Sequence, residues 1–556
     1  MSVDEAWFEK QLIKATVIMN RSSVRKDNKG LKNADMFYCS PNFLSLTMAG
    51  RTNYLFFNVF GLKECRKIQS DVIEAATIRN TDIYLSFSSD MDKSLCYKLP
   101  ALLWKGITVV FSPSMKWIDG QVESLRRIGV SCYVWTPELT IRDVERMIKD
   151  MSTMDPNYRI IYWMAKVSER NFFFERMLQD LSERDLLNYF VVEEAYRITE
   201  WGHNFEAKYL SLSRFREICP NVPWIVLNGP ANPIAEEDIL KQLEFGGDRP
   251  YEIFKTSCSR FNLFYSVVSV EYLIEMEKDR IKKLLQRHHS KHALPPGTGD
   301  INPDIYSVIK MNSLMYIKKL YQAFNGCSGI VYCNSGRDCE DMSKYLQENG
   351  IPSLHYHSSL YDDYKKMVKQ RWIRNDINVI CVPVGYDIGV KKNDVRFVIH
   401  MSCPNDLTTY YEETGNAGRD GDKSFCRLYK SESLMRRLKI FSSMKKSSCK
   451  DISSCEESKR NPEYLVEAVK WMLQYCEGQR CRHVIFRDYF GEDSFDSCES
   501  NCDFCIQRNQ FSRVTQLSSN ESTQDTLEES NSNRKRPATE SINMSEDDSP
   551  KKPRND

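Results

Sequence analysis

Residues 83–103 read IYLSFSSDMDKSLCYKLPALL, an apolar run followed by a polar loop and then by helical text. A strand that passes through a short loop into a helix is the first half of a βαβ unit, in which helices cover a parallel sheet. The same alternation recurs along the chain, which predicts an α/β protein. The expected strands form an earlier set, 83–87, 107–111, 132–135, 159–163, 190–192 and 224–227, and a later, smaller set, 329–333, 379–382, 397–400 and 425–429.

Length and charge narrow the class of protein. The chain has 556 residues, and at roughly 100 to 200 residues per domain we expect three or four structural units. It has no run of about 18 apolar residues, so we expect no membrane-spanning helix. The first residues, MSVDEAWFEK, do not resemble a secretory signal, so we expect an intracellular chain with reduced cysteines. The net charge of +1 provides no overall cationic field, so any binding to nucleic acid would depend on local basic patches.

Four cysteines near the end of the chain have the spacing of a metal site. Cys498, Cys502 and Cys505 form a C-x3-C-x2-C pattern, and Cys481 lies 17 positions before the first of them. Four thiolates close a tetrahedral site around zinc, and such a site is structural because no coordination position stays open. Ordinary buried thiols are the alternative, but clustered cysteines in an intracellular chain favour zinc.

Two segments of the sequence lack the alternating strand and helix pattern. Residues 271–292 have a helical pattern that turns basic, which indicates an insertion or linker, and a solvated helix face explains the charge better than a DNA contact does. Residues 506–556 contain a single aromatic residue, Phe511, and are rich in Ser, Asn, Glu and Asp, so we expect a disordered tail. Within this tail, RKRP (534–537) and KKPR (551–554) predict import into the nucleus, with a plain solvated charge run as the alternative.

The loop inside residues 83–103 has the layout of a phosphate-binding loop. Lys93 and Ser94 stand between the expected strand and the expected helix. In such a loop the lysine reaches the β- and γ-phosphates, and the serine hydroxyl binds Mg²⁺. This loop contains no glycine, and Asp90 and Asp92 place carboxylates where the phosphates of a nucleotide would lie. Taken alone, the loop does not identify a nucleotide site.

A series of longer stretches supplies the missing context. In chain order they read FGLKECRKIQ (60–69), DKSLCYKLPAL (92–102), VVFSP (109–113), VVEEAY (191–196) followed by WGHNF (201–205), FNLFYSVV (261–268), GIVYCNSGRDCEDMSKYLQENGI (329–351), DVRFVIH (394–400) and YYEETGNAGRDG (410–421). Together with the cysteine cluster, these stretches resemble the RecQ family of superfamily 2 DNA helicases over residues 55–505. WGHNF and the cysteine spacing are the most specific parts of the resemblance.

The resemblance implies two RecA-like lobes of the P-loop NTPase type, with ATP and Mg²⁺ between them, and a small helical zinc-binding subdomain. It also implies binding to single-stranded or forked DNA, 3′ to 5′ movement, and work in DNA repair and recombination. The expected parts are an N-terminal extension (1–50), a first lobe (51–268), a linker with a basic helix (269–325), a second lobe (326–445), the zinc-binding subdomain (446–505) and the tail (506–556).

The resemblance further implies roles for single residues. Arg66 and Gln69 read adenine, Lys93 and Ser94 bind phosphate and Mg²⁺, Glu193 stands at the position of the Mg²⁺-positioning carboxylate, Glu194 polarises the attacking water, Arg419 stabilises the transferred phosphoryl group, and Trp201, His203 and Phe205 sense DNA. A plain core position suits Phe205 equally well.

The chain departs from the family pattern around the expected nucleotide. The phosphate loop lacks glycines, Glu193 replaces an Asp, Tyr196 replaces a His, Asn228-Gly229-Pro230-Ala231-Asn232 replaces the TAT element, Lys391 replaces an Asp, and Asn416 replaces an Arg. These changes predict a RecQ-like protein that binds DNA, and perhaps nucleotide, but hydrolyses ATP weakly or not at all. The alternatives are an active ATP-dependent 3′–5′ DNA helicase and a non-enzymatic nuclear scaffold.

Overall fold

The computed structural model describes residues 40–62, 65–88, 91–113, 115–136, 139–164, 172–196, 211–276, 278, 305–386, 388–389, 391–443, 462–493 and 495–509. The chain divides into two compact units, Met1–Cys505 and Ile506–Asp556, and every element named below lies in the first. Among the described residues, no helix has the length and apolar character that a membrane crossing requires. Some predicted features lie outside the described residues: Asp90, Trp201, His203, Phe205, most of 271–292, and both basic clusters at 534–537 and 551–554.

The first sheet contains seven parallel strands in the order β3-β4-β2-β5-β6-β1-β7. All six strands predicted for this part of the chain are present. The seventh, β7, was not predicted, because its residues are mostly exposed at the sheet edge and form no apolar run. The strands are β1 (Asp82–Ser86), β2 (Ile107–Ser112), β3 (Cys132–Trp135), β4 (Ile160–Met164), β5 (Leu187–Val192), β6 (Trp224–Asn228) and β7 (Tyr251–Lys255).

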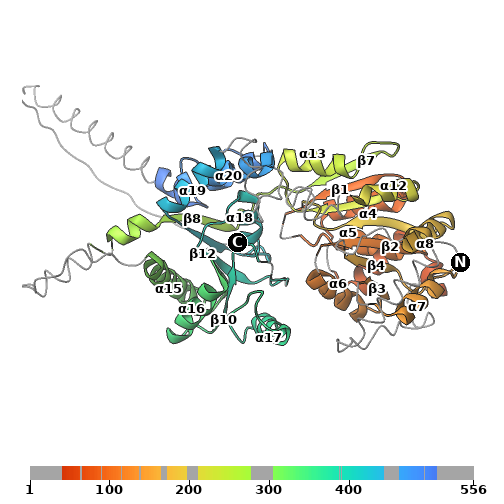
Figure 1. The fold of residues 1–556 in the computed structure, drawn as a ribbon, viewed down its shortest axis with the longest axis horizontal. Coiled ribbons are helices and arrows are strands. Elements are labelled where there is room, and N and C mark those ends of the chain that lie inside the picture. Colours follow the sequence, from red (N-terminus) through yellow and green to blue (C-terminus); the bar gives the residue numbers. More distant parts are fainter. Residues whose placement is uncertain are drawn as a thin grey trace, which may run out of the picture. The chain divides into compact units, whose positions relative to one another are not determined.

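Helices cover both faces of this sheet (Figure 1), and alternate residues of β1 point into two separate cores. Ile83 and Leu85 belong to one core, whereas Tyr84 belongs to the other, as the two-residue period of a strand requires. The first core is covered by α2 (Pro41–Leu44), the π-helix η3 (Leu55–Val59) that continues α3 (Met48–Tyr54), α4 (Lys67–Ile78), α5 (Leu95–Leu103) and α6 (Met115–Arg127). The second is covered by α7 (Ile141–Met151), α8 (Phe172–Glu183), η5 (Ser211–Ser213), α12 (Arg214–Ile218) and α13 (Pro233–Gln242).

The second sheet contains six parallel strands in the order β10-β11-β9-β12-β13-β8. The four predicted strands are present, and β8 and β10 join them. β8 pairs with β13 from Leu263 to Ser269, so the second sheet begins before residue 268, where we expected the first lobe to end. An apolar run does not itself reveal which sheet it joins. The strands are β8 (Leu263–Ser269), β9 (Ser328–Cys333), β10 (Ser353–His355), β11 (Val379–Pro383), β12 (Val395–His400) and β13 (Ser424–Lys430).

Helices also pack on both faces of the second sheet. One core contains residues of α15 (Ile305–Ala323) and α16 (Gly336–Glu348), and the other contains residues of α17 (Asp362–Ile373), α18 (Leu407–Thr414), α20 (Pro462–Glu477) and α21 (Arg482–Tyr489), while α19 (Glu432–Ser443) packs on α20. Within the sheet, Gly329 of β9 lies against the ring of Phe397 of β12, and a Cβ atom at residue 329 would overlap that ring. The close approach of these two strands therefore requires a glycine.

Candidate active site and metal centre

A cavity of about 330 Å³ is lined by residues that follow strands of both sheets. Five of the seven residues predicted for the ATP site line it, namely Lys93, Ser94, Glu193, Glu194 and Arg419. The carboxyl ends of parallel strands are where the loops of an α/β fold build a binding site. The fold therefore brings together residues that the sequence separates by more than 300 positions.

Asp92 organises the loop that leads into α5. Its Oδ1 accepts hydrogen bonds from the backbone nitrogen of Ser94 at 3.2 Å and from the Ser94 hydroxyl at 2.9 Å. Lys391 Nζ lies 3.2 Å from the same oxygen. Burial acts to raise the pKa of Asp92, but Lys391, Lys98 and the Ser94 hydrogen bond outweigh it and lower the pKa to about 2. The carboxylate is therefore ionised, and the hydroxyl predicted to bind Mg²⁺ is already hydrogen-bonded.

The Lys93 ammonium group lies near carboxylates and near other positively charged side chains. Burial lowers the pKa of its ammonium group, and the carboxylates of Glu194 and Glu412 oppose that shift. A Cβ atom at Gly229 would lie 3.6 Å from Lys93 Nζ and 3.5 Å from Glu412 Oε1, so the glycine backbone borders both groups. Glu412 was not predicted as a site residue, although it lies inside the quoted stretch YYEETGNAGRDG, because nothing local to that stretch indicates Lys93 as its neighbour.

Glu193 is almost fully buried at the end of β5. Its Oε1 accepts a hydrogen bond from the Tyr97 hydroxyl at 2.8 Å, and that hydroxyl lies 3.0 Å from the Tyr162 hydroxyl. Burial raises the pKa of Glu193 to about 7, against the effects of the Tyr97 hydrogen bond and of Lys98. Burial therefore favours the protonated form of the carboxyl group predicted to position Mg²⁺.

Glu194 adopts a left-handed backbone conformation, with a φ angle of 53°. Few non-glycine residues adopt this conformation, and where it occurs the surrounding structure has to hold it. Here the Tyr196 hydroxyl donates to Glu194 Oε2 at 3.0 Å, and the backbone nitrogen of Tyr196 donates to Asn228 Oδ1 at 3.1 Å. Tyr196, which stands where the family has a histidine, therefore fixes the position of the Glu194 carboxylate.

Arg419 contacts another substituted position of the family pattern. Its Nη2 donates to Asn416 Oδ1 at 2.9 Å, and Asn416 Nδ2 donates to the Tyr332 hydroxyl at 3.2 Å. A neutral amide therefore bridges Arg419 to β9 where the family places a second arginine, and the cavity carries one positive charge fewer at this point.

The two residues predicted to read adenine lie at the start of α4 and do not line the cavity. Gln69 Nε2 donates to the backbone oxygen of Asp92 at 3.2 Å, and Gln69 Oε1 accepts from the backbone nitrogen of Arg66 at 3.4 Å. Gln69 therefore ties the start of α4 to the loop before α5, which places both residues beside the phosphate loop.

A short segment between β7 and β8 connects the two sheets. Thr256 Oγ1 accepts a hydrogen bond from the backbone nitrogen of Ser88 at 2.7 Å, just before the phosphate loop. Four residues later, Arg260 Nη2 donates to the backbone oxygens of Ala417 at 2.9 Å and of Gly418 at 2.7 Å, next to Arg419. The connection therefore contacts both sides of the cavity.

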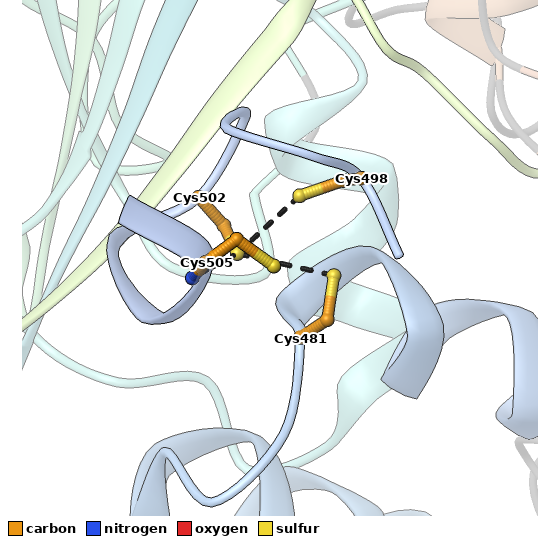
Figure 2. A group of neighbouring side chains, drawn as sticks. All are labelled: Cys481, Cys498, Cys502 and Cys505. Carbon is orange, nitrogen blue, oxygen red and sulfur yellow. Dashed lines mark hydrogen bonds between the residues drawn. The ribbon is translucent and has the colours of Figure 1, made fainter. Parts of the chain in front are cut away.

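The four predicted zinc ligands meet because the fold brings the start of α21 beside residues 498–505, the last of which begin a helix. All four cysteines are buried, and their sulfur atoms lie within 4.8 Å of one another (Figure 2). Cys498 and Cys502 are 3.4 Å apart at sulfur, and Cys502 and Cys481 are 3.9 Å apart. With Zn–S bonds of about 2.3 Å, tetrahedral geometry places sulfur atoms about 3.8 Å apart. The cluster therefore fits a four-thiolate zinc site.

Charged groups attach this centre to the second sheet. Arg482 forms two hydrogen bonds with the Asp503 carboxylate, at 2.8 Å and 3.0 Å, and Asp503 Oδ2 also accepts from the backbone nitrogen of Val267 on β8 at 2.8 Å. Glu492 accepts from the backbone nitrogen of Cys258 at 2.6 Å. The segment around the cysteines therefore holds β8 and the residues before it, which is consistent with β8 joining the second sheet.

Comparisons with known proteins agree with this architecture. A family model described as RecQ zinc-binding matches residues 436–506, and one described as helicase conserved C-terminal domain matches residues 312–421. The ATP-dependent DNA helicase Q5 of Rattus norvegicus is 30% identical over 454 residues, which are 80% of this chain and 42% of that protein. The RecQ-like DNA helicase BLM of Xenopus laevis is 30% identical over 465 residues, which are 82% of this chain and 30% of that protein.

Over four fifths of its length, this chain is similar to RecQ helicases. The chain spans less than half the length of the two curated relatives named above. Its fold is also that of the crystal structure of the DUF1998 helicase MrfA bound to DNA, with a TM-score of 0.54 and 13% identity, over 76% of this chain and 54% of that one. The cysteine cluster lies within the residues that match the RecQ zinc-binding model, which supports zinc as the bound metal.

Proposed function

We propose that this RecQ-like chain binds DNA and takes ATP into the cavity between its sheets, but hydrolyses ATP slowly, so that unwinding is weak or lost. The observation that carries the proposal is the contact of the ionised Asp92 with both Ser94 and Lys391. Asp92 does not itself line the cavity, but it contacts the lining residues Ser94 and Lys391, so its charge lies close to an entering triphosphate. Two unit charges about 4 Å apart repel by about 4 kcal/mol at an effective dielectric of 20. Because 59% of the Asp92 side chain is exposed, solvent reduces that figure.

The residues of the cavity divide the work of hydrolysis in this proposal. Lys93 contacts the β- and γ-phosphates, Glu194 orients the attacking water, and Arg419 neutralises charge on the transferred phosphoryl group. Arg66 and Gln69 contact the base. Ser94 and Glu193 would hold Mg²⁺, which supplies charge neutralisation between the phosphates. Their hydrogen bonds, to Asp92 and from Tyr97, must be exchanged for the ion, and Glu193 must lose its proton.

The active ATP-dependent 3′–5′ helicase remains the second candidate, because a specific observation favours it. Lys93, Glu194 and Arg419 line one cavity, although two of the three precede the second sheet in the sequence. Tyr196 also holds Glu194 through a hydrogen bond, so the substitution of the family histidine does not leave the carboxylate unsupported.

DNA is the proposed macromolecular partner, in single-stranded or forked form. The relatives are named as DNA helicases, and Trp201, His203 and Phe205 are the residues proposed to sense DNA. We further propose a nuclear protein acting in DNA repair and recombination, with a first lobe that ends before β8 and a second lobe that includes β8 and α15 and ends near residue 445. The linker expected at 269–325 shortens to the residues between β8 and α15, because α15 packs in the core of the second sheet. The zinc-binding subdomain follows at 446–505.

ATP turnover measured with and without single-stranded DNA tests the proposal. We expect the wild-type chain to bind a fluorescent ATP analogue yet to turn ATP over at a rate close to that of Lys93→Ala and Glu194→Gln. DNA-stimulated turnover that both substitutions abolish would establish the active helicase instead. A DNA affinity that falls steeply with salt supports contact with the phosphate backbone, and an affinity that does not change with salt argues against it.

A further inference from the structure

A second group of potential metal ligands lies in the second lobe, away from the cysteines and outside the lining of the cavity. Glu340 belongs to α16, His355 ends β10, and His357 follows two residues later. One ligand atom of each side chain lies within 4.8 Å of the others. All three residues are distant in sequence from the predicted zinc ligands, and the cavity residues do not include them.

Local structure explains why the two histidines face the same way. Side chains two residues apart along an extended chain point to the same side, so a His-x-His sequence presents both rings together. The ring centroids of His355 and His357 are 5.6 Å apart. The start of α16 lies against the second ring, because a Cβ atom at Gly336 would lie 3.0 Å from the His357 ring. A glycine therefore lets the ring sit beside the helix that carries Glu340.

We propose that Glu340, His355 and His357 form a binding site for a divalent transition-metal ion, with Zn²⁺ as the ion that suits the ligands best. His357 Nε2 and Glu340 Oε1 are 3.1 Å apart. Two ligands with bonds of about 2.0 to 2.1 Å to a tetrahedral zinc ion lie about 3.3 Å from each other, so this pair needs little movement. Two imidazoles and one carboxylate, with the fourth position open to solvent, are a ligand set that zinc accepts.

His355 is the ligand whose side chain must move before the site can bind an ion. Its ring is half-buried, and its plane lies 20° from that of His357, so the imidazole must turn to direct a nitrogen at a shared ion. Tyr364 of α17 also stacks on this ring, with the centroids 5.6 Å apart. Among the described residues, none forms a hydrogen bond with the His355 ring nitrogens, so no such bond opposes the rotation.

Zinc binding at this site replaces the hydrogen bond between His357 and Glu340: the neutral imidazole carries its proton on Nδ1 and binds the ion through Nε2. Because 52% of the Glu340 side chain is exposed and three ligands leave one position to water, the ion exchanges more readily than one held by four buried thiolates. A bound ion would join α16 to the loop after β10. The alternative is a plain hydrogen bond between His357 and Glu340 that binds no metal.

Zinc titration of the full chain against a chromophoric chelator tests the site. The sequence contains His288, His289 and His292 close together, and these can bind zinc by themselves. All titrations therefore use a chain in which these three are replaced by alanine. We expect a second zinc, weaker than the tightly held one. His355→Ala and Glu340→Gln should each weaken it on the order of 100-fold, because each removes one of three ligands.

Glu348→Gln is the matched control, since Glu348 is also an exposed carboxylate on α16. Titration with Co²⁺ provides a second readout: the additional site should give visible absorption without the charge-transfer band of thiolate ligands. The inference is overturned if the chain lacking the three histidines binds no second zinc, or if either His355→Ala or Glu340→Gln leaves the second zinc unchanged. Melting temperatures of the variants close to that of the parent show that a lost site is not a lost fold.

Discussion

Lys391 Nζ lies 3.2 Å from Asp92 Oδ1, although 299 positions separate the two residues in the sequence. Each residue departs from the family pattern by its charge, Asp92 in the phosphate loop and Lys391 where the family has an aspartate. The Lys391 ammonium also lies 5.3 Å from the centre of the Trp117 ring. The two departures therefore meet as an ion pair at the cavity, and they are best understood as one change.

Asp92→Asn should strengthen nucleotide binding. The substitution removes a negative charge beside the cavity and weakens the hydrogen bond to the Ser94 hydroxyl. We therefore expect the Kd of a fluorescent ATP analogue to fall by about tenfold, equivalent to about 1.4 kcal/mol. An unchanged Kd would mean that this carboxylate does not limit binding.

Asp71→Asn provides the matched control for this measurement, because Asp71 is an exposed aspartate of the same lobe but does not form the ion pair that Asp92 forms with Lys391. Lys391→Met completes the comparison. If Lys391 mainly neutralises Asp92, its loss should weaken binding in the wild-type chain more than in Asp92→Asn.

Glu193 should make stability depend on pH. Its pKa is raised by burial from 4.5 to about 7, so between these values the folded protein holds a proton that the unfolded chain has released. The stabilisation is complete below pH 4.5 and is lost as the pH rises to 7. Glu193→Gln keeps an uncharged group at every pH. The melting temperature of this variant minus that of the wild type should therefore increase between pH 5 and pH 8 in Mg²⁺-free buffer. A constant difference would contradict this assignment.

Cys498→Ser should release the tightly held zinc and loosen the second lobe. Cys498 belongs to the same buried core as residues of α18 and β13, so loss of the centre exposes apolar surface there. We expect zinc analysis to show the loss of one ion per chain, and limited proteolysis to cut the variant faster. Cys65→Ser, at a half-buried cysteine outside the cluster, should keep the zinc. Retention of zinc by Cys498→Ser would exclude this residue as a ligand.

Gly329→Ala should destabilise the second sheet. The added methyl group overlaps the Phe397 ring, and overpacking of this kind typically costs about 1 to 3 kcal/mol. Thermal unfolding should show a lower melting temperature, and Phe397→Leu in the same chain should recover part of the loss. Equal melting temperatures for the wild type and Gly329→Ala would show that the ring moves aside without cost.

The sequence predicts the buried strands well, because a strand covered on both faces is a continuous apolar run. β1 and β9 are examples. It does not predict β7, whose residues are exposed at an edge, or β10, which has three residues. The sequence also does not show which of the two sheets β8 joins, because that depends on the pairing of β8 with β13.

The sequence likewise predicts one part of the candidate site and misses another. Motifs name Lys93, Glu194 and Arg419 one at a time, and the fold places them around one cavity. The contact between Asp92 and Lys391 depends on both sheets, so no local pattern indicates it. The roles of Trp201, His203 and Phe205 stay predictions.

The connection from Thr256 to Arg260 limits how the cavity can open. Four peptide steps reach at most about 14 Å, and one end is anchored beside the phosphate loop and the other beside Arg419. The two lobes can therefore separate very little on that side. Any opening of the cavity must be a rotation of one lobe about this connection, and the displacement is largest on the opposite side of the cavity.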